Sequence, residues 1–261
     1  MTQSAALSAA RNRAAVAQEL RRLLPKMEGF SAAPTLPFGL SAIDRCLPQG
    51  GLACGGLHEV VPEAGSTAAA LGFVAALLGR LLPRAYPLVL VMPAYGFRES
   101  GRPHGHGFDG LGLDPGGLIL VETAHRKDSL WAMEEALHSG APAAVAGVID
   151  KLDLRLSQRL QLAAVDAGLP LFLLRQAQLL ESSAAATRWR IGTAAAARDR
   201  FGLFAHPRWR LRLERCRNGR AGEWVVEYDH VTHRFSLAAA LADPAFSRGV
   251  SDRSCRKANR S

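Results

Sequence analysis

The chain has 261 residues, 48% of them hydrophobic, and a formal net charge of +9. It is long and apolar enough for one globular domain with terminal extensions, and no run reaches the roughly 18 uncharged apolar residues of a membrane span. No apolar signal segment accompanies the N-terminal arginines, and none of the four cysteines has zinc-ligand spacing. We therefore expect a cytoplasmic protein with reduced thiols and without membrane contact.

The first 35 residues are expected to form an amphipathic helix followed by a linker. Apolar residues recur at helical spacing between residues 8 and 28, Pro25 ends or bends the helix, and a stretch containing Gly29 and Pro34 follows. This helix could pack on its own domain, on a neighbouring subunit or on a partner.

Residues 36–246 alternate apolar strands with helices and predict an α/β domain. We expect strands at 57–61, 87–92, 117–122, 143–149 and 169–174, and helices at 67–82, 128–138 and 154–167. Continuous apolar strands separated by helices are typical of a mostly parallel sheet covered by helices on both faces.

The end of the chain has a different pattern. Two strands at 209–217 and 223–228 are joined through Asn218-Gly219 and predict an antiparallel hairpin at the edge of the sheet. The polar, basic tail at 247–261 is expected to be disordered.

A glycine-rich segment precedes the first long strand. Leu36–Val60 contains Gly39, Asp44, Gly50-Gly51 and Glu59 in the order found before the phosphate loop of RecA-like proteins. The paired glycines permit the positive φ angles of a tight turn. The segment therefore resembles a RecA-like core, and the resemblance implies that a phosphate-binding loop follows.

The loop that follows lacks its lysine. In RecA-like proteins it reads G-x-x-x-x-G-K-[ST]: backbone N–H groups hold the phosphates, the Lys neutralises them and the Ser or Thr binds Mg²⁺. The remnants here are Pro62, Glu63, Gly65, Ser66 and Thr67. We therefore expect no ATP binding, no other cofactor and no ATPase activity.

The acids of a RecA-type ATPase are also incomplete. After the strand at 87–92 no carboxylate occurs before Glu99. Asp150 follows the strand at 143–149, where a Walker-B-like acid would bind Mg²⁺ through water. Its alternative roles are a helix N-cap or a carboxylate at the strand end, and the missing lysine favours these structural roles.

The resemblance extends over residues 36–236 and narrows to one family. It includes Leu113-Asp114-Pro115, the helix at 128–137 with Trp131, Thr187–Ile191, and Leu213–Arg220 followed by Trp224 and Tyr228. These features resemble the ImuA family, whose members are similar to RecA and to the cell-division inhibitor SulA.

The ImuA resemblance implies a function in the DNA-damage (SOS) response. It implies a non-catalytic RecA-like accessory protein of translesion mutagenesis, nucleoid-associated when active. Its implied role is an adaptor with the polymerase-like protein ImuB and an error-prone DnaE-type polymerase, and RecA and single-stranded DNA are further partners to test. The competing predictions are an active RecA-type ATP-dependent DNA-binding protein and a SulA-like division inhibitor.

Arginines concentrate late in the chain. Residues 188–220 hold ten arginines and two acids, which favours binding of nucleic acid or an acidic partner, although a solvated surface can have the same composition. The triplet Arg188-Trp189-Arg190 could clamp phosphates and stack on a base. Trp189 could equally belong to the core.

A second group of arginines follows the period of a strand. Arg208, Arg210 and Arg212 alternate with apolar residues, so they should form a basic stripe over a buried face. We expect this stripe, continued by Arg215 and Arg217, to meet DNA phosphates or an acidic partner.

His104 and His106 form a His-x-His pair within a glycine-rich stretch. Such a pair can begin a metal site, but no obvious carboxylate partner accompanies it. We expect a flexible loop there and no metal.

Overall fold

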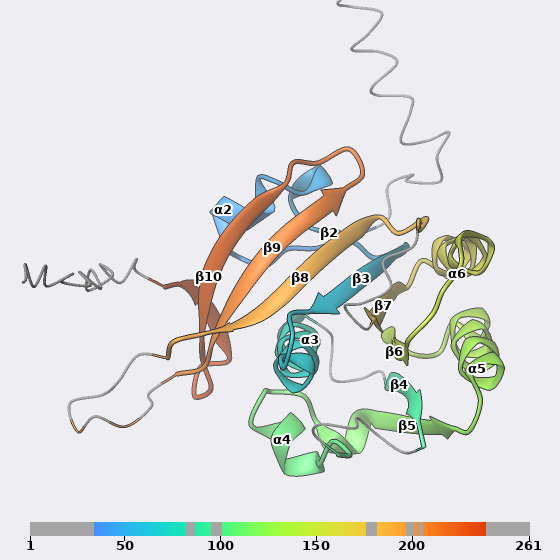
Figure 1. Ribbon diagram of the computed structural model, residues 1–261, viewed down its shortest axis with the longest axis horizontal. Helices are drawn as coiled ribbons and strands as arrows, with labels where there is room; N and C mark the ends of the chain where they lie inside the picture. The colour runs from blue at the N-terminus through green and yellow to red at the C-terminus, as the bar shows by residue number, and fades with distance from the viewer. Residues whose placement is uncertain are drawn as a thin grey trace, which may run out of the picture.

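The computed structural model describes residues 34–81, 87–94, 101–175, 182–196, 201, 203 and 206–238. The expected N-terminal helix and the tail at 247–261 lie outside the described residues, as does Glu99. Within the described part, a nine-stranded sheet has the order β11-β10-β9-β8-β3-β7-β6-β4-β5 (Figure 1).

Six neighbouring strands are parallel and make up most of the sheet. They are β3 (Gly56–Pro62), β4 (Leu88–Pro93), β5 (Leu118–Thr123), β6 (Ala144–Ile149), β7 (Pro170–Arg175) and β8 (Thr187–Ala194). Every residue of β3, β6 and β7 is buried, as continuous apolar runs predict for strands covered on both faces. The parallel α/β prediction is therefore confirmed.

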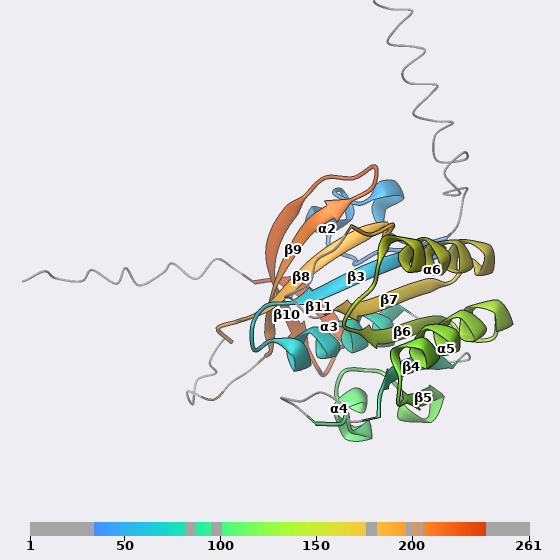
Figure 2. The same cartoon turned by 45° about the vertical axis from the view of Figure 1, so that its right-hand side comes forward.

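Helices cover both faces of the parallel strands. α3 (Thr67–Leu81) packs on one face, and α5 (Arg126–Ser139) and α6 (Leu154–Ala167) lie together on the other (Figure 2). Two separate apolar clusters result, one around Phe73 and Leu77 of α3 and one around Met133 of α5 and Leu160 of α6.

Short elements complete the described fold. β1 (Thr35–Leu36) pairs with β2 (Leu52–Ala53), and the short helices are α2 (Ser41–Asp44), α4 (Gly105–Asp109), η1 (Pro48–Gly50) and η2 (Pro115–Gly117). None of the helices in the described ranges is long and apolar enough to cross a membrane.

The antiparallel part is larger than a hairpin. The predicted pair is present as β9 (Arg208–Cys216) and β10 (Gly222–Asp229), with Asn218 at φ 60° in the connection. β8 also pairs antiparallel with β9, and β11 (Arg234–Leu237) adds a further antiparallel strand beside β10. Among the described helices, α5 and α6 pack on the parallel strands and leave the outer face of β9 and β10 uncovered (Figure 1).

Candidate functional site

The loop between β3 and α3 is a compact turn held by its own backbone. The Glu63 N–H donates to the Ile191 carbonyl at 2.7 Å, and the Ser66 N–H donates to the Glu63 carbonyl at 2.9 Å. Gly65 has φ 69°, and Ser66 is buried. Two N–H groups of the loop are therefore already used inside the protein, whereas a phosphate loop turns such groups toward its ligand.

A carboxylate of this loop reaches the neighbouring antiparallel strands. Glu63 Oε2 accepts a hydrogen bond from Arg210 Nη1 at 3.2 Å, across 147 residues of sequence, and the Glu63 side chain lies against Gly192 of β8. The structure thus joins two separately predicted groups, the phosphate-loop remnant and the arginine stripe. The Glu63 carboxylate and the Arg210 guanidinium neutralise each other, and the loop itself has no lysine to attract a phosphate.

Asp150 stands directly after β6 and is partly buried. The N-cap of α6 is Asp153, whose Oδ1 accepts the Leu156 N–H at 2.8 Å. Of the two structural roles expected for Asp150, the strand-end position fits this geometry and the N-cap does not.

Three charged side chains form a buried network beneath the sheet surface. Glu59 of β3 accepts from Arg175 Nη1 at 2.8 Å through one carboxylate oxygen and from Arg188 Nε at 2.7 Å through the other. The side chains of Glu59 and Arg175 are 0% exposed. Arg188 therefore binds a carboxylate in the interior of the fold. This ion pair was not predicted from the sequence. Glu59 was the available signal, because a charged residue in a buried apolar strand needs a partner of opposite charge.

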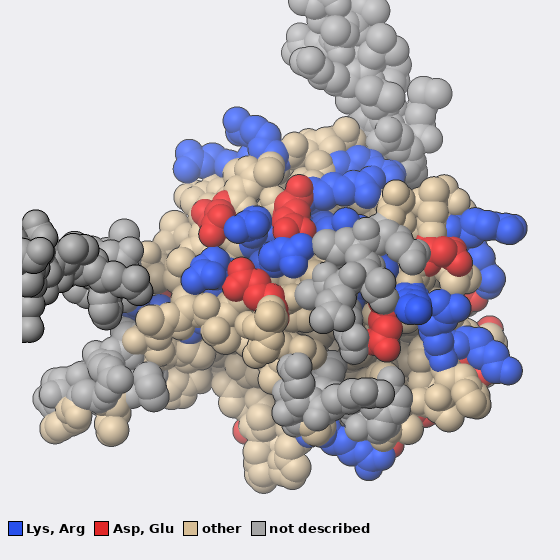
Figure 3. Space-filling view, viewed as in Figure 1, with Lys and Arg blue, Asp and Glu red and all other residues tan. Residues whose placement is uncertain are grey.

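The predicted stripe lies on the face where we expected it, with Trp209, Leu211 and Leu213 buried on the other side. Its arginines each meet a carboxylate: Arg208 pairs with Glu227 at 2.6 Å and Arg212 with Glu223 at 3.4 Å, besides the Arg210–Glu63 pair. Figure 3 shows basic and acidic side chains interleaved over β8, β9 and β10. This face is a mosaic of opposite charges, so a phosphate would have to compete with an internal carboxylate for each arginine.

The remaining predicted arginines also have partners within the protein. Arg190 pairs with Glu214 through two hydrogen bonds, while Arg215 and Arg217 donate to the carbonyls of Ser183 and Ala184 at 2.6 and 3.4 Å. These two contacts hold the chain segment that leads into β8.

Trp189 lies in the core, which was one of the two positions expected for it; the other was a surface position where it could stack on a base. It is 2% exposed, its Nε1 donates to Thr187 Oγ1 at 3.0 Å, and its ring packs against Phe38 and Trp224 with centroids 5.3 and 6.2 Å apart. In this position the ring is out of reach of a base.

One exposed apolar surface was not predicted. Trp131 of α5 is 63% exposed and Leu162 of α6 is 61% exposed. An ion pair between Arg159 Nη2 and Glu134 Oε2, 2.7 Å apart, joins the two helices. Trp131 lies one turn before Glu134 on α5, and Leu162 lies one turn after Arg159 on α6, so the two apolar side chains flank this ion pair. We call Trp131, Glu134, Arg159 and Leu162 the α5–α6 surface. Tryptophan is enriched among the residues that dominate binding energy at protein interfaces, so Trp131 is a candidate contact residue.

Comparison with known proteins gives a clear relationship. The chain is 35% identical over 237 residues to Protein ImuA from each of two strains of Caulobacter vibrioides, an alignment that covers 83% of this chain and 95% of the relative. No family model matches the chain.

Proposed function

The chain belongs to the ImuA family of damage-inducible mutagenesis proteins, and we propose that it acts in that process as a non-catalytic adaptor. In this proposal the domain is a RecA-like core that binds ImuB and an error-prone DnaE-type polymerase. RecA and single-stranded DNA are secondary partners to test. Its cellular place is then the cytoplasm, at the nucleoid during repair.

The observation that carries the proposal is the Glu63–Arg210 pair in the β3–α3 loop. The loop has no lysine, its glutamate is neutralised by the protein's own arginine, and its N–H groups on Glu63 and Ser66 are bonded internally. A triphosphate would therefore lack its main cationic partner at this loop and could not bind to the N–H groups of Glu63 and Ser66. A protein with this loop is suited to binding other macromolecules rather than to nucleotide turnover.

We propose that the α5–α6 surface, and not the arginine stripe of β9, makes the adaptor contact. Tryptophan is enriched among residues that dominate binding energy, and an exposed ring does so by entering an apolar pocket on the partner. Trp131 is available for this, whereas the mosaic arginines are paired internally. We propose that an apolar segment of ImuB covers Trp131 and Leu162.

The test is the affinity of the purified chain for ImuB. Trp131→Ala should weaken binding by about 10-fold or more, the loss expected for an interface anchor, and should lower damage-induced mutation in cells. Val231→Ala is the matched control, because Val231 is also exposed but lies in the turn between β10 and β11. Equal ImuB affinity for both variants and the unaltered chain would remove the α5–α6 surface from the proposal.

The two competing functions predict other results. A RecA-type ATPase requires nucleotide turnover by this chain. A SulA-like inhibitor requires that overproduction of the chain makes cells filament even when ImuB is absent.

A further inference from the structure

Three polar side chains from separate segments meet at one end of the antiparallel strands. His206 precedes β9 by two residues, Asp229 is the last residue of β10, and His230 begins the turn to β11. The pairing of Arg208 with Glu227 brings the start of β9 beside the end of β10. One ligand atom from each of the three residues lies within 4.8 Å of the other two.

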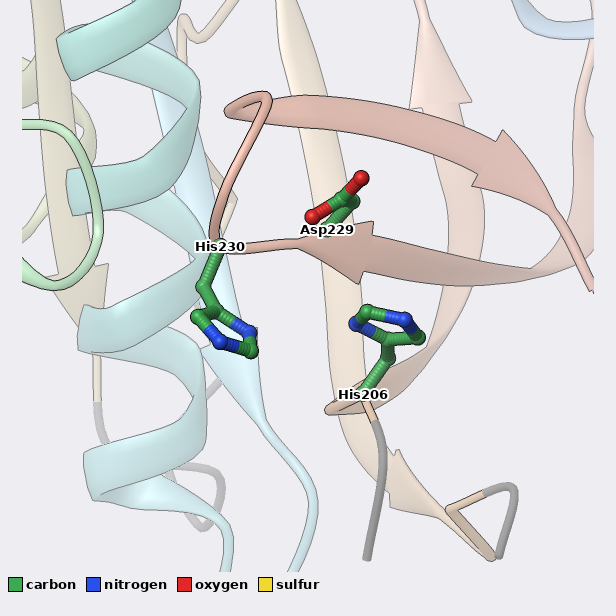
Figure 4. A group of neighbouring side chains, drawn as sticks. All are labelled: His206, Asp229 and His230. Carbon is green, nitrogen blue, oxygen red and sulfur yellow. The ribbon is translucent and has the colours of Figure 1, made fainter. Parts of the chain in front are cut away.

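The two histidine rings face each other across a small gap. Figure 4 shows a ring nitrogen of each histidine directed into this gap, with the Asp229 carboxylate beside it. The ring centroids of His206 and His230 are 5.7 Å apart. This arrangement places two imidazole nitrogens and one carboxylate oxygen around a common point.

The carboxylate of Asp229 is fixed in position and charged. Oδ2 accepts from Thr232 Oγ1 at 2.8 Å, and Oδ1 accepts the N–H groups of Val231 and Thr232 at 2.8 and 3.3 Å. The hydrogen bond from the Thr232 side chain and then that from the Val231 N–H hold the pKa of Asp229 below its usual value. An oriented, ionised carboxylate is the form that a cation binds.

His206 provides an independent sign of a missing ligand. Its Nδ1 is shielded from solvent and has no hydrogen-bond partner. A buried polar atom without a partner is unfavourable and calls for an explanation such as a bound ion. A ring nitrogen of His206 is directed toward His230 and Asp229, so a cation in the gap would give the His206 ring a partner.

We propose that His206, Asp229 and His230 bind a divalent transition-metal ion of the zinc class. Imidazole nitrogens suit zinc, nickel and copper, whereas calcium and magnesium require oxygen ligands. Zinc bonds to nitrogen and carboxylate oxygen are about 2.0–2.2 Å long, so small side-chain rotations would bring the three atoms into coordination distance. Three protein ligands leave a fourth position for water or for a side chain of a partner.

The metal would join the start of β9 to the end of its neighbour β10. His206 lies on the chain entering β9, and Asp229 and His230 lie at the turn between β10 and β11. An ion that binds only the folded chain stabilises it by mass action. Metal binding should therefore raise the melting temperature of the antiparallel part together with the whole domain.

The experiment is a metal titration of the full chain after removal of metals with a chelator. Zn²⁺ should bind with a stoichiometry of one and raise the melting temperature by about 5 °C or more at roughly 100 times Kd. Co²⁺ should give a visible absorption spectrum without a thiolate charge-transfer band, which separates this site from cysteine binding.

The decisive variant is His230→Ala. His230 is exposed, so this change should leave the metal-free melting temperature unaltered and weaken Zn²⁺ binding by about 10-fold or more. The double variant His104→Ala, His106→Ala is the matched control, because it removes another pair of neighbouring histidines, whose ring centroids are 5.3 Å apart. The proposal is wrong if Zn²⁺ does not bind stoichiometrically, or if His230→Ala binds it as tightly as the unaltered chain does.

Discussion

The buried carboxylate of Glu59 balances the positive charges of two arginine side chains, those of Arg175 and Arg188. Replacing it with Gln should destabilise the protein by about 3–5 kcal/mol, because the buried Arg175 would keep its charge and lose its carboxylate. Urea unfolding monitored by circular dichroism measures this loss of unfolding free energy.

The matched control for Glu59 is Glu223, which pairs with Arg212 at the surface with 52% of its side chain exposed. Glu223→Gln should cost less than about 1 kcal/mol, since exposed ion pairs are screened by water. Similar losses for the two variants would contradict a structural role for the Glu59 network.

His58 makes the stability depend on pH. It is fully buried, and desolvation lowers its pKa from 6.5 to about 4 despite the hydrogen bond to the Ala53 carbonyl. The ring is therefore neutral in the folded state: Nε2 donates to Ala53 and Nδ1 accepts from Thr187 Oγ1 at 2.8 Å. Between pH 6.5 and 4 the unfolded chain binds this proton and the folded chain does not, so acidification favours unfolding.

We expect His58 to account for about 2 kcal/mol of lost stability between pH 7.5 and pH 5. Chemical denaturation of the unaltered chain and of His58→Gln at both pH values gives the comparison. The variant should lose less free energy on acidification than the unaltered chain does. An identical loss in both proteins would show that His58 is not the titrating group.

At the scale of elements, the two glycines of α3 should respond oppositely to alanine. A Cβ at Gly79 would lie 2.6–2.8 Å from backbone atoms of Gly112 and Leu113, so Gly79→Ala should cost about 1–3 kcal/mol through overpacking. A Cβ at Gly72 would make an ordinary contact with Leu111 at 3.6 Å, so Gly72→Ala should stabilise the helix by about 0.5–1 kcal/mol. Thermal unfolding of the two variants checks both signs.

The regular elements could be predicted because their patterns are local. Apolar runs located β3, β4, β6 and β7 to within one or two residues, and helical periodicity located α3 and α6. β11 was missed because it has only four residues, Arg234–Leu237, which are largely exposed and too few for their polar–apolar alternation to identify a strand. The pairing of β8 with β9 widens the antiparallel region. It could not be predicted, because the connection between the two strands is too long to be recognised as a hairpin turn.

The candidate site was predictable only in part. The period-two alternation of the stripe can be read from the sequence, and it places the arginines on the correct face of β9. The missing lysine can be read there too, but its consequence for nucleotide binding stays a prediction. The pairing of Glu63 with Arg210 spans 147 residues and depends on how β8 and β9 lie beside β3, which no local pattern encodes. The net charge of the arginine block therefore overstated the positive charge that the folded surface presents.

At the scale of the whole molecule, the sheet divides into two parts with different surfaces. The parallel strands are covered by α3 on one face and by α5 and α6 on the other, and their helices carry the exposed Trp131 and Leu162. The antiparallel strands present the charge mosaic and the proposed metal site on His206, Asp229 and His230. The Glu63–Arg210 pair connects the two parts at the loop between β3 and α3.

The most direct measurement of the central claim is nucleotide binding and turnover by the purified full chain. Calorimetric titration with Mg²⁺-ATP and a phosphate-release assay should be run with and without single-stranded DNA, on the unaltered chain and on Asp150→Ala. We predict no saturable binding up to about 1 mM nucleotide, which corresponds to about −4 kcal/mol, and no phosphate release above the blank. ATP turnover that Asp150→Ala abolishes would contradict the adaptor account.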